Sequence, residues 1–177
     1  MKKILLAALA AVLPALLLAA SDYLKYIDLA DEAVRKQDWN RAEELLREAM
    51  RSEPSNPQNV MLLSNVGMFQ FYRGEDSLAL HTLSEARAIA PASTVILNNR
   101  AKILRHMGRE QDAMKDYDKV IEMDSLNYDA YFNRGYLRLV HGDSVGAKSD
   151  LATLERLRPD DPNTLLVLAV MYSNQGR

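Results

Sequence analysis

The residues that could do chemistry in this chain gather in few places, and their spacing argues against catalysis. The stretch Asp129–Asp143 combines asparagine, arginine, histidine and aspartate, but it does not follow the order of any known catalytic motif. A zinc site on a helix needs histidines four residues apart, and no two of His81, His106 and His141 have this spacing. We therefore interpret the histidines as solvated residues near helix ends.

Acidic pairs and glycine-containing motifs also argue against catalysis. Acid–base catalysis by a pair such as Glu43 and Glu44 needs a shared pocket that perturbs their pKa values, whereas the pattern places this pair on a polar helix face. The chain has no phosphate-binding glycine loop and no G-x-S-x-G motif. Cysteine is absent, which excludes disulfides, thiolate metal ligands and a cysteine nucleophile. The sequence predicts a protein that is not an enzyme and that uses no metal or other cofactor.

The composition indicates a folded, helical chain. Of the 177 residues, 48% are hydrophobic, which is too many for a disordered chain. Aromatic residues make up only 7% and there are only 7 glycines, while alanine and leucine are abundant, and this balance favours helices. The formal net charge is −2, and no run of basic residues is present. Because nucleic-acid binding requires a basic stripe, we exclude nucleic acid as a partner.

The first 21 residues have the three parts of a secretory signal. Lys2 and Lys3 form a basic start, Ile4–Ala20 is a run of seventeen uncharged residues, and small residues precede Asp22. We therefore predict a signal peptide over residues 1–21, cleaved after Ser21, and an exported protein that is periplasmic or associated with the cell envelope. The alternative is an uncleaved N-terminal membrane anchor with the lysines on the inner side.

Residues that recur every thirty-four positions show how the rest of the chain is organised. The recurring glycines are Gly74, Gly108, Gly142 and Gly176. Between them, apolar residues follow a helical period; a glycine ends the first helix of each interval, and a residue before proline ends the second, as at Pro159. Self-similarity at this period predicts stacked units, each made of a helix, a tight turn and a second helix.

Four such units resemble the tetratricopeptide repeat family. They span residues 23–56, 60–93, 94–127 and 128–161. Residues typical of the family in the second and fourth units are Leu63, Gly67, Ala79, Leu83, Pro91, Tyr131, Gly135, Ala147, Leu151 and Pro159. The resemblance implies an all-α, right-handed solenoid over residues 22–177, with four helix pairs followed by a ninth helix over residues 162–175.

The units depart from the family pattern at a few positions. Arg100 and Arg134 replace a leucine, and Gln70 and Arg138 replace an aromatic residue. Because long polar side chains can bury their stems, we expect their polar ends to reach the edge of the fold. Three extra residues, Pro57–Asn59, separate the first two units and are expected to change the local stacking angle.

The resemblance also implies a binding surface, because the first helix of each tetratricopeptide unit lines a concave face. The residues expected to bind a peptide there are Asn65, Met68, Phe71, Tyr72, Asn98, Asn99, Lys102, Arg105, Phe132, Asn133 and Tyr136. The amides of Asn65, Asn99 and Asn133 can pair with the backbone of an extended peptide, unless asparagine is simply common at this position of the family. The aromatic residues can hold apolar side chains, and Lys102 and Arg105 favour an acidic residue or a terminal carboxylate.

These patterns predict a non-catalytic scaffold or adaptor for protein–protein interaction that holds an extended partner segment and acts in envelope assembly. Its partner is a protein or peptide, and it meets the membrane only through an uncleaved N-terminal segment. The ninth helix carries an apolar strip, Leu166, Val167 and Val170, that the fourth unit leaves uncovered. This strip predicts a homodimer or partner contact, unless the natural chain continues beyond Arg177. The main alternative to the adaptor is a structural subunit whose solenoid serves self-association.

Overall fold

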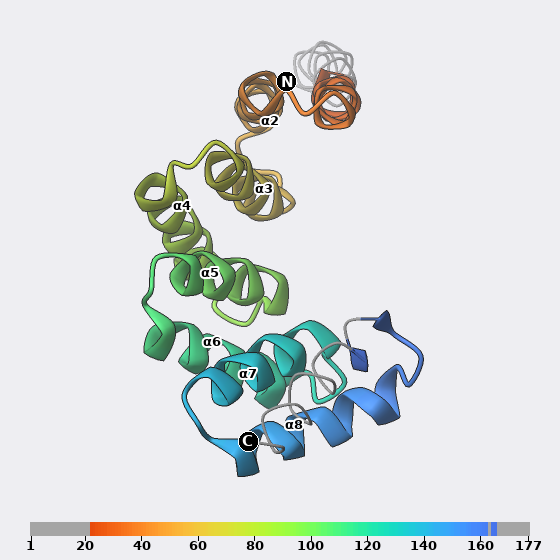
Figure 1. Cartoon of the computed structure of the whole chain (residues 1–177). Helices are drawn as coiled ribbons and strands as arrows, with labels where there is room; N and C mark the ends of the chain where they lie inside the picture. Colours follow the sequence, from red (N-terminus) through yellow and green to blue (C-terminus); the bar gives the residue numbers. More distant parts are fainter. Residues whose placement is uncertain (1–21, 163, 166–177) are drawn as a thin grey trace, which may run out of the picture. The chain divides into compact units, whose positions relative to one another are not determined.

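The computed structural model describes residues 22–162 and 164–165, and within these ranges it contains helices and turns but no strand. The chain divides into two compact units, Met1–Ile89 and Ala90–Arg177, each of which holds two helix pairs (Figure 1). The expected all-α helical repeat fold is therefore confirmed. The leader over residues 1–21 and most of the expected ninth helix lie outside the described residues.

Unit 1 begins with a helical segment over residues 22–35. It continues with α2 (Trp39–Ser52), α3 (Asn59–Tyr72) and α4 (Asp76–Ile89). α2 packs against α3, and α3 packs against α4.

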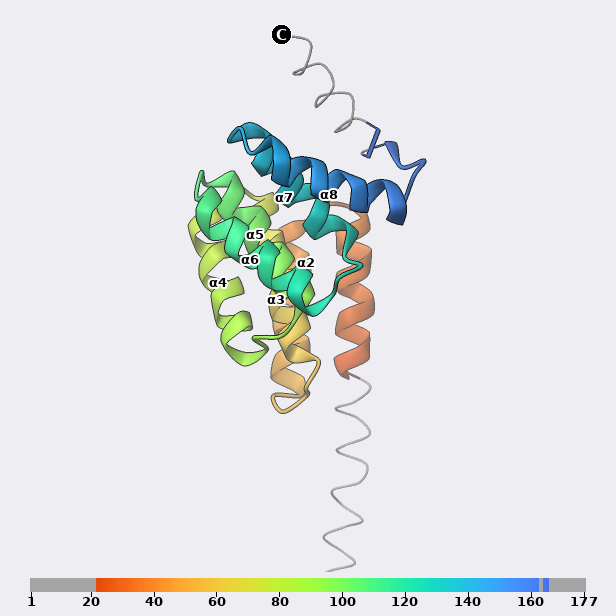
Figure 2. The same cartoon turned by 90° about the horizontal axis from the view of Figure 1, so that it is seen from below.

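Unit 2 consists of four helices in the same alternation. They are α5 (Thr94–His106), α6 (Glu110–Met123), α7 (Tyr128–Val140) and α8 (Ser144–Leu157). Each of these helices packs against the next along the chain, and α7 and α8 lie side by side in Figure 2. Over the described parts of both units, no helix is long and apolar enough to cross a membrane.

The tight turn inside three of the helix pairs depends on glycine. Gly74, Gly108 and Gly142 have φ angles of 79°, 73° and 78°, in the left-handed region that glycine enters without strain. Gln37 occupies the corresponding turn of the first pair, with a φ of 57°. The thirty-four-residue ladder missed this position, because the three extra residues Pro57–Asn59 shift Gln37 to thirty-seven residues before Gly74.

Small residues allow the helices of each pair to approach closely. The second helix of every pair has a fully buried alanine at the same repeat position: Ala42, Ala79, Ala113 and Ala147. The first helix of the fourth pair contributes Gly135, where an added Cβ would lie 3.2 Å from Cβ of Asp150, so this glycine lets α7 and α8 approach closely. Leu46, Val66 and Phe69 belong to the apolar core around the first pair.

A network of polar side chains lies inside unit 1. Gln70 is fully buried, so the expectation that its polar end reaches the edge is wrong. Its Nε2 donates to Glu43 at 3.0 Å, and its Oε1 accepts a hydrogen bond from Thr82 at 2.7 Å. Glu43 also accepts hydrogen bonds of 2.7 Å from both Arg47 and Arg73. Glu43 is therefore part of an interior network rather than of the expected polar helix face.

The same network sets the ionisation of Glu43. Burial alone would raise its pKa, because a carboxylate loses hydration inside the protein. Hydrogen bonds from Arg73, Arg47 and Gln70 to the ionised carboxylate outweigh burial and hold the pKa of Glu43 below its ordinary value.

Arginines of unit 2 turn inward and meet buried aspartates. Arg100 donates to Asp116 at 2.6 Å across α5 and α6. Arg134 holds Asp150 with hydrogen bonds of 2.6 and 3.0 Å across α7 and α8, and Arg138 adds one of 2.8 Å. Asp116 and Asp150 are only 3% and 1% exposed. The expectation that these arginine ends reach the edge is wrong for Arg100, because a buried carboxylate on the second helix compensates its charge. Arg134 and Arg138 also pair with the exposed carboxylates of Asp118 and Asp143, so their polar ends reach both the interior and the edge.

Candidate functional site

The expected binding residues of unit 2 lie on the first helix of each pair. They are Asn98, Asn99, Lys102 and Arg105 on α5, and Phe132, Asn133 and Tyr136 on α7. The two sets meet where the guanidinium carbon of Arg105 lies 5.8 Å from the ring centre of Tyr136. Spacings of three or four residues place further side chains on the same sides of these helices. We call the resulting surface, formed by Asn99, Lys102, Arg105, Asn133 and Tyr136, the α5–α7 face.

Asn98 has a structural task beside this face. Its Nδ2 donates to Oδ1 of Asn127 at 3.1 Å. The same oxygen of Asn127 accepts the backbone N–H of Ala130 at 3.1 Å and so caps the start of α7. Asn98 therefore ties α5 to the first turn of α7, and this contact uses one of the two N–H donors of its amide.

Asn133 is already bonded to its own helix. Its Nδ2 donates to the carbonyl oxygen of Asp129 at 2.8 Å, one turn earlier. This local bond is typical of asparagine within a helix, where the side chain competes for the nearest backbone group. An amide offers two N–H donors and an acceptor oxygen, so one local bond uses only part of its capacity. Asn133 is half-buried, and so is Asn99 on the neighbouring helix.

Arg105 lies between two tyrosines. Its guanidinium faces the ring of Tyr136, which is 42% exposed. On the inner side is Tyr117 of α6, which is fully buried. Burial raises the pKa of Tyr117 to about 12, and the positive charge of Arg105 opposes this only in part. Tyr117 therefore stays neutral at all physiological pH values and gives Arg105 no counter-charge.

Phe132 belongs to the core of unit 2 more than to its surface. Its ring stacks on Tyr128 with centres 6.3 Å apart and an interplanar angle of 12°. Tyr128 is buried, and its hydroxyl donates to Asp161 at 2.8 Å and lies 2.9 Å from Oγ1 of Thr164. Phe132 thus helps to fix α7 against the segment that follows α8, which leaves Tyr136 as the more accessible aromatic residue of this helix.

The expected binding residues of unit 1 all lie on α3. Asn65 is exposed, Met68 is only 8% exposed, Phe71 is half-buried and Tyr72 is 49% exposed. Asn65 and Tyr72 are therefore accessible to a ligand, whereas Met68 is almost entirely part of the interior. Asn65 belongs to unit 1, while Asn99 and Asn133 belong to unit 2.

Sequence reasoning missed the residue that organises the aromatic side chains of unit 1. Trp39, the first residue of α2, lies 4.9 Å from Tyr72 and 5.8 Å from Phe69 between ring centres. Phe71 lies 5.9 Å from Tyr72. Only first helices were considered as lining residues, so a tryptophan at the start of a second helix was left out. The sequence does offer one sign of this role, because Trp39 is the only tryptophan of the chain.

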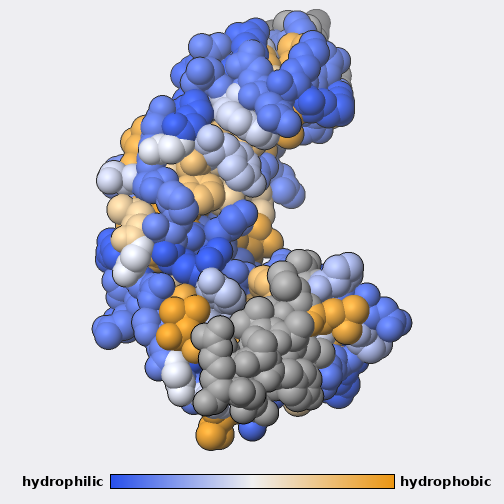
Figure 3. Space-filling view, viewed as in Figure 1, coloured by the Kyte–Doolittle hydropathy of each residue, from blue (hydrophilic) through white to orange (hydrophobic). Residues whose placement is uncertain are grey.

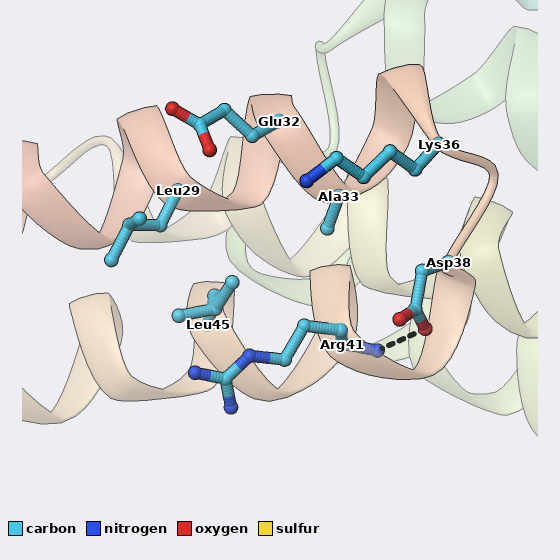
Figure 4. A pocket seen from close by; sticks show the side chains of 7 residues that line it. All are labelled: Leu29, Glu32, Ala33, Lys36, Asp38, Arg41 and Leu45. Carbon is cyan, nitrogen blue, oxygen red and sulfur yellow. Dashed lines mark hydrogen bonds between the residues drawn. The ribbon is translucent and has the colours of Figure 1, made fainter.

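A surface hollow of about 190 Å³ lies between the helical segment at 22–35 and α2 (Figure 4). It is lined by Leu29, Glu32, Ala33, Lys36, Asp38, Arg41 and Leu45. Asp38 accepts the backbone N–H of Arg41 at 3.0 Å and thereby caps α2. The charged residues around the hollow are two acids and two bases, so it favours neither an anion nor a cation.

The described surface seen in Figure 3 is mostly hydrophilic, with hydrophobic atoms in small separate patches. The apolar strip expected at Leu166, Val167 and Val170 lies outside the described residues. Within the ranges that the structure describes, no three histidine, aspartate or glutamate side chains are arranged to hold a metal ion.

Comparison with known proteins identifies the repeat. The family model "Tetratricopeptide repeat" matches residues 95–125, which include all but the first residue of α5 and the whole of α6. The human "Tetratricopeptide repeat protein 6" is 25% identical over 116 residues, covering 66% of this chain and 22% of the relative. The chain therefore spans less than a quarter of the length of this curated relative.

Solved structures agree with this match. A tetratricopeptide repeat protein from Parabacteroides merdae superposes with a TM-score of 0.77 and 28% identity, covering 88% of this chain and 61% of that one. YrrB, described as a tetratricopeptide protein with an unusual peptide-binding site, superposes with a TM-score of 0.68 and 20% identity, covering 92% and 87%. The fold is an all-α repeat scaffold of the kind that other proteins use for protein–protein interaction. By sequence in residues 95–125 and by fold over most of its length, the chain is similar to tetratricopeptide repeat proteins.

Proposed function

We propose that this protein is a non-catalytic adaptor that holds an extended segment of a partner protein, with the α5–α7 face of unit 2 as its main contact. A second contact in unit 1 is formed by the half-buried Phe71 and the more exposed Tyr72 of α3, with Trp39 of α2, whose ring centre lies 4.9 Å from that of Tyr72. Apart from Trp39, both surfaces use residues of the first helices of the repeats, and repeat scaffolds of this kind offer extended surfaces for binding.

The observation that carries the proposal is the contrast between the arginines of unit 2. Arg100, Arg134 and Arg138 reach inward to buried aspartates, whereas Arg105 lies against the exposed ring of Tyr136. A half-buried cation and a half-exposed aromatic ring at one place suit recognition more than packing, because tyrosine and arginine are the residue types that carry most energy in protein interfaces.

A structural neighbour supports the same proposal. YrrB, which shares the fold at 20% identity, is described as having a peptide-binding site. At that identity the likeness concerns the fold, so the choice of surface in this chain rests on its own residues.

The test is calorimetric titration of a partner peptide, captured by crosslinking in cells that express the protein natively. Asn99→Ala is expected to weaken binding more than Lys102→Ala, because an exposed ion pair contributes only about 0–1 kcal/mol. Only the Lys102 effect is expected to fade at high salt, since salt screens charges in solvent. Wild-type affinity in both variants would mean that the α5–α7 face does not bind the partner.

The same proposal includes an exported location and envelope assembly, which rest on the leader sequence. Lys2, Lys3 and the uncharged run Ile4–Ala20 support a secretory signal cleaved after Ser21. N-terminal sequencing of the native protein tests this, and an intact Met1 in a membrane fraction would identify an anchor instead. Homodimerisation through Leu166, Val167 and Val170 is a separate proposal, which light scattering of wild type and Leu166→Glu decides.

A further inference from the structure

We infer that Arg105 anchors the partner by binding the carboxylate of an internal aspartate or glutamate side chain. This inference rests on the proposed function, and it names the chemical group that the α5–α7 face selects. The group is a single planar carboxylate with apolar neighbours in the partner segment.

The cations of the two first helices of unit 2 differ in the partners that they have within the chain. α5 and α7 carry four arginines, and three of them are bonded to buried aspartates, Asp116 or Asp150. Arg105 is the arginine that makes no ion pair with a carboxylate among the described residues. Lys102 and His106, the other basic residues of this part of α5, are each engaged by other residues of the chain.

Arg105 is also held in place before any ligand arrives. Its Nε is buried and makes no hydrogen bond within the described structure. Its guanidinium carbon lies 5.8 Å from the ring centre of Tyr136, and the side chain is close enough to the buried Tyr117 for its charge to oppose the rise in the pKa of that hydroxyl. Fixing a long side chain in advance removes much of the entropy that binding would otherwise cost. Partial burial also strengthens its attraction for an anion, since less water screens the charge.

The shape of the guanidinium selects a carboxylate. Its planar fork of N–H groups matches the two oxygens of a carboxylate, which lysine cannot do. One arginine that makes no ion pair within the described residues balances one negative charge, so a monoanionic carboxylate fits better than a doubly charged phosphate. The exposed ring of Tyr136 lies directly beside the guanidinium and can cover an apolar residue next to the acid.

The experiment uses the full chain and an array of synthetic peptides of about nine residues, long enough at roughly 3.3 Å per residue to follow both helices. All peptides are acetylated and amidated, with varied leucine, valine, tyrosine and proline around a fixed centre of glutamate, glutamine or phosphoserine. Wild type is expected to bind glutamate-centred peptides roughly tenfold or more tightly than their glutamine counterparts, as for a charge-assisted hydrogen bond. Phosphoserine is expected to give no gain over glutamate.

Variants assign this preference to one side chain. Arg105→Gln is expected to abolish the preference for glutamate, and Arg105→Lys to restore only part of it. Arg156→Gln on α8 makes the same change of charge in the same unit and is expected to keep the preference. Circular dichroism of each variant shows whether it is folded. If Arg105→Gln does not fold, the glutamate preference of Arg105→Lys is compared with that of wild type instead.

The outcomes separate this inference from the proposed function. Equal binding of glutamate and glutamine peptides by wild type would overturn the inference while leaving the adaptor function in place. Equal loss of the preference in Arg156→Gln would overturn it as well. A glutamine-centred peptide with a free C-terminal carboxylate that binds as well as the glutamate peptide would assign the site to chain ends instead. No binding to any peptide of the array would count against the adaptor function itself, and the inference would fall with it.

Discussion

The two units fill the same pair of repeat positions in different ways. One position lies on the first helix of each pair and the other lies sixteen residues later on the second helix. In chain order the pairs are Leu29 and Leu45, Val66 and Thr82, Arg100 and Asp116, and Arg134 and Asp150. Unit 1 thus uses apolar or neutral residues, and unit 2 uses ion pairs of 2.6 Å. The repeat accepts either solution when both positions change together.

The difference has an energetic consequence. A buried ion pair must offset the loss of hydration of both charges, so it often stabilises no more than an apolar pair of similar size. Removing one partner is much worse, because the other charge stays inside the protein. Single substitutions at these two positions are expected to cost less stability in unit 1 than in unit 2.

The largest expected effect is that of Asp150→Ala. It removes the carboxylate that Arg134 and Arg138 share, and we expect it to lower the free energy of unfolding by about 3–5 kcal/mol. Thr82→Ala at the corresponding position of unit 1 loses one hydrogen bond to Gln70 and is expected to cost about 1–3 kcal/mol. Urea unfolding followed by circular dichroism measures both. Equal costs would mean that the charge at this position does not matter.

A second prediction exchanges one solution for the other. Arg100→Leu with Asp116→Leu gives the third repeat the apolar pair found at Leu29 and Leu45, which needs no hydrogen-bond partner. Each single change is expected to cost more than the double variant, which we expect to lie within about 1 kcal/mol of wild type. The coupling energy from the four unfolding curves is therefore expected to be about 2–3 kcal/mol. If the losses of stability from the two single changes add up, the two residues contribute independently, and the two positions need not change together.

The sequence predicted the fold of the chain but not these buried ion pairs. The repeat period and the turn glycines predicted the all-α fold, because periodicity in one chain directly reports stacked helix pairs. The burial of Arg100 and Arg134 was missed, although aspartate follows each of them by sixteen residues. An arginine that is compared only with residues of its own helix gives no sign of the aspartate that pairs with it on the next helix.

The candidate site was less predictable than the fold. Spacing placed Lys102, Arg105 and Tyr136 on first helices, but it could not show that Arg105 faces Tyr136. Asn98 and Asn133 bond to residues of their own unit, since amides take the nearest backbone or cap partner. Such local competition leaves no trace in the repeat pattern.

A third prediction uses pH to separate the units. A carboxyl whose pKa is lower in the folded state contributes stability that is present above the unfolded pKa and is lost as pH falls through the folded pKa. Glu43 has a lowered pKa, so its contribution to unit 1 is expected to disappear as the pH falls below about 4.5. Trp39 fluorescence during unfolding at a series of pH values follows this locally, because Trp39 lies one turn before Glu43 on α2.

The control for this titration is the neighbouring glutamate. Glu43→Gln is expected to flatten the loss of stability in acid, whereas Glu44→Gln, on the exposed side of α2, is expected to leave the wild-type profile. The effect should be smaller than that of Asp150→Ala, because the lowered pKa of Glu43 is what remains after burial has opposed its hydrogen bonds. A profile unchanged by Glu43→Gln would remove Glu43 from the acid response of unit 1.

The smallest expected effect concerns the one turn of the four that lacks glycine. Gln37 has a φ of 57°, and a residue with a Cβ pays roughly 1–2 kcal/mol in this left-handed region. Gln37→Gly removes that strain, but it also gives the unfolded chain more freedom, which costs about 0.4–1 kcal/mol. We therefore expect a net stabilisation of about 0.5–1 kcal/mol. Gln37→Ala keeps the strain and is expected to bring no gain. Urea unfolding followed by Trp39 fluorescence, two residues beyond the turn, resolves the difference. If Gln37→Gly leaves the stability unchanged or lowers it, contacts of the Gln37 side chain already offset the strain of its backbone. The first turn would then be as stable as the glycine turns at Gly74, Gly108 and Gly142, but for a different reason.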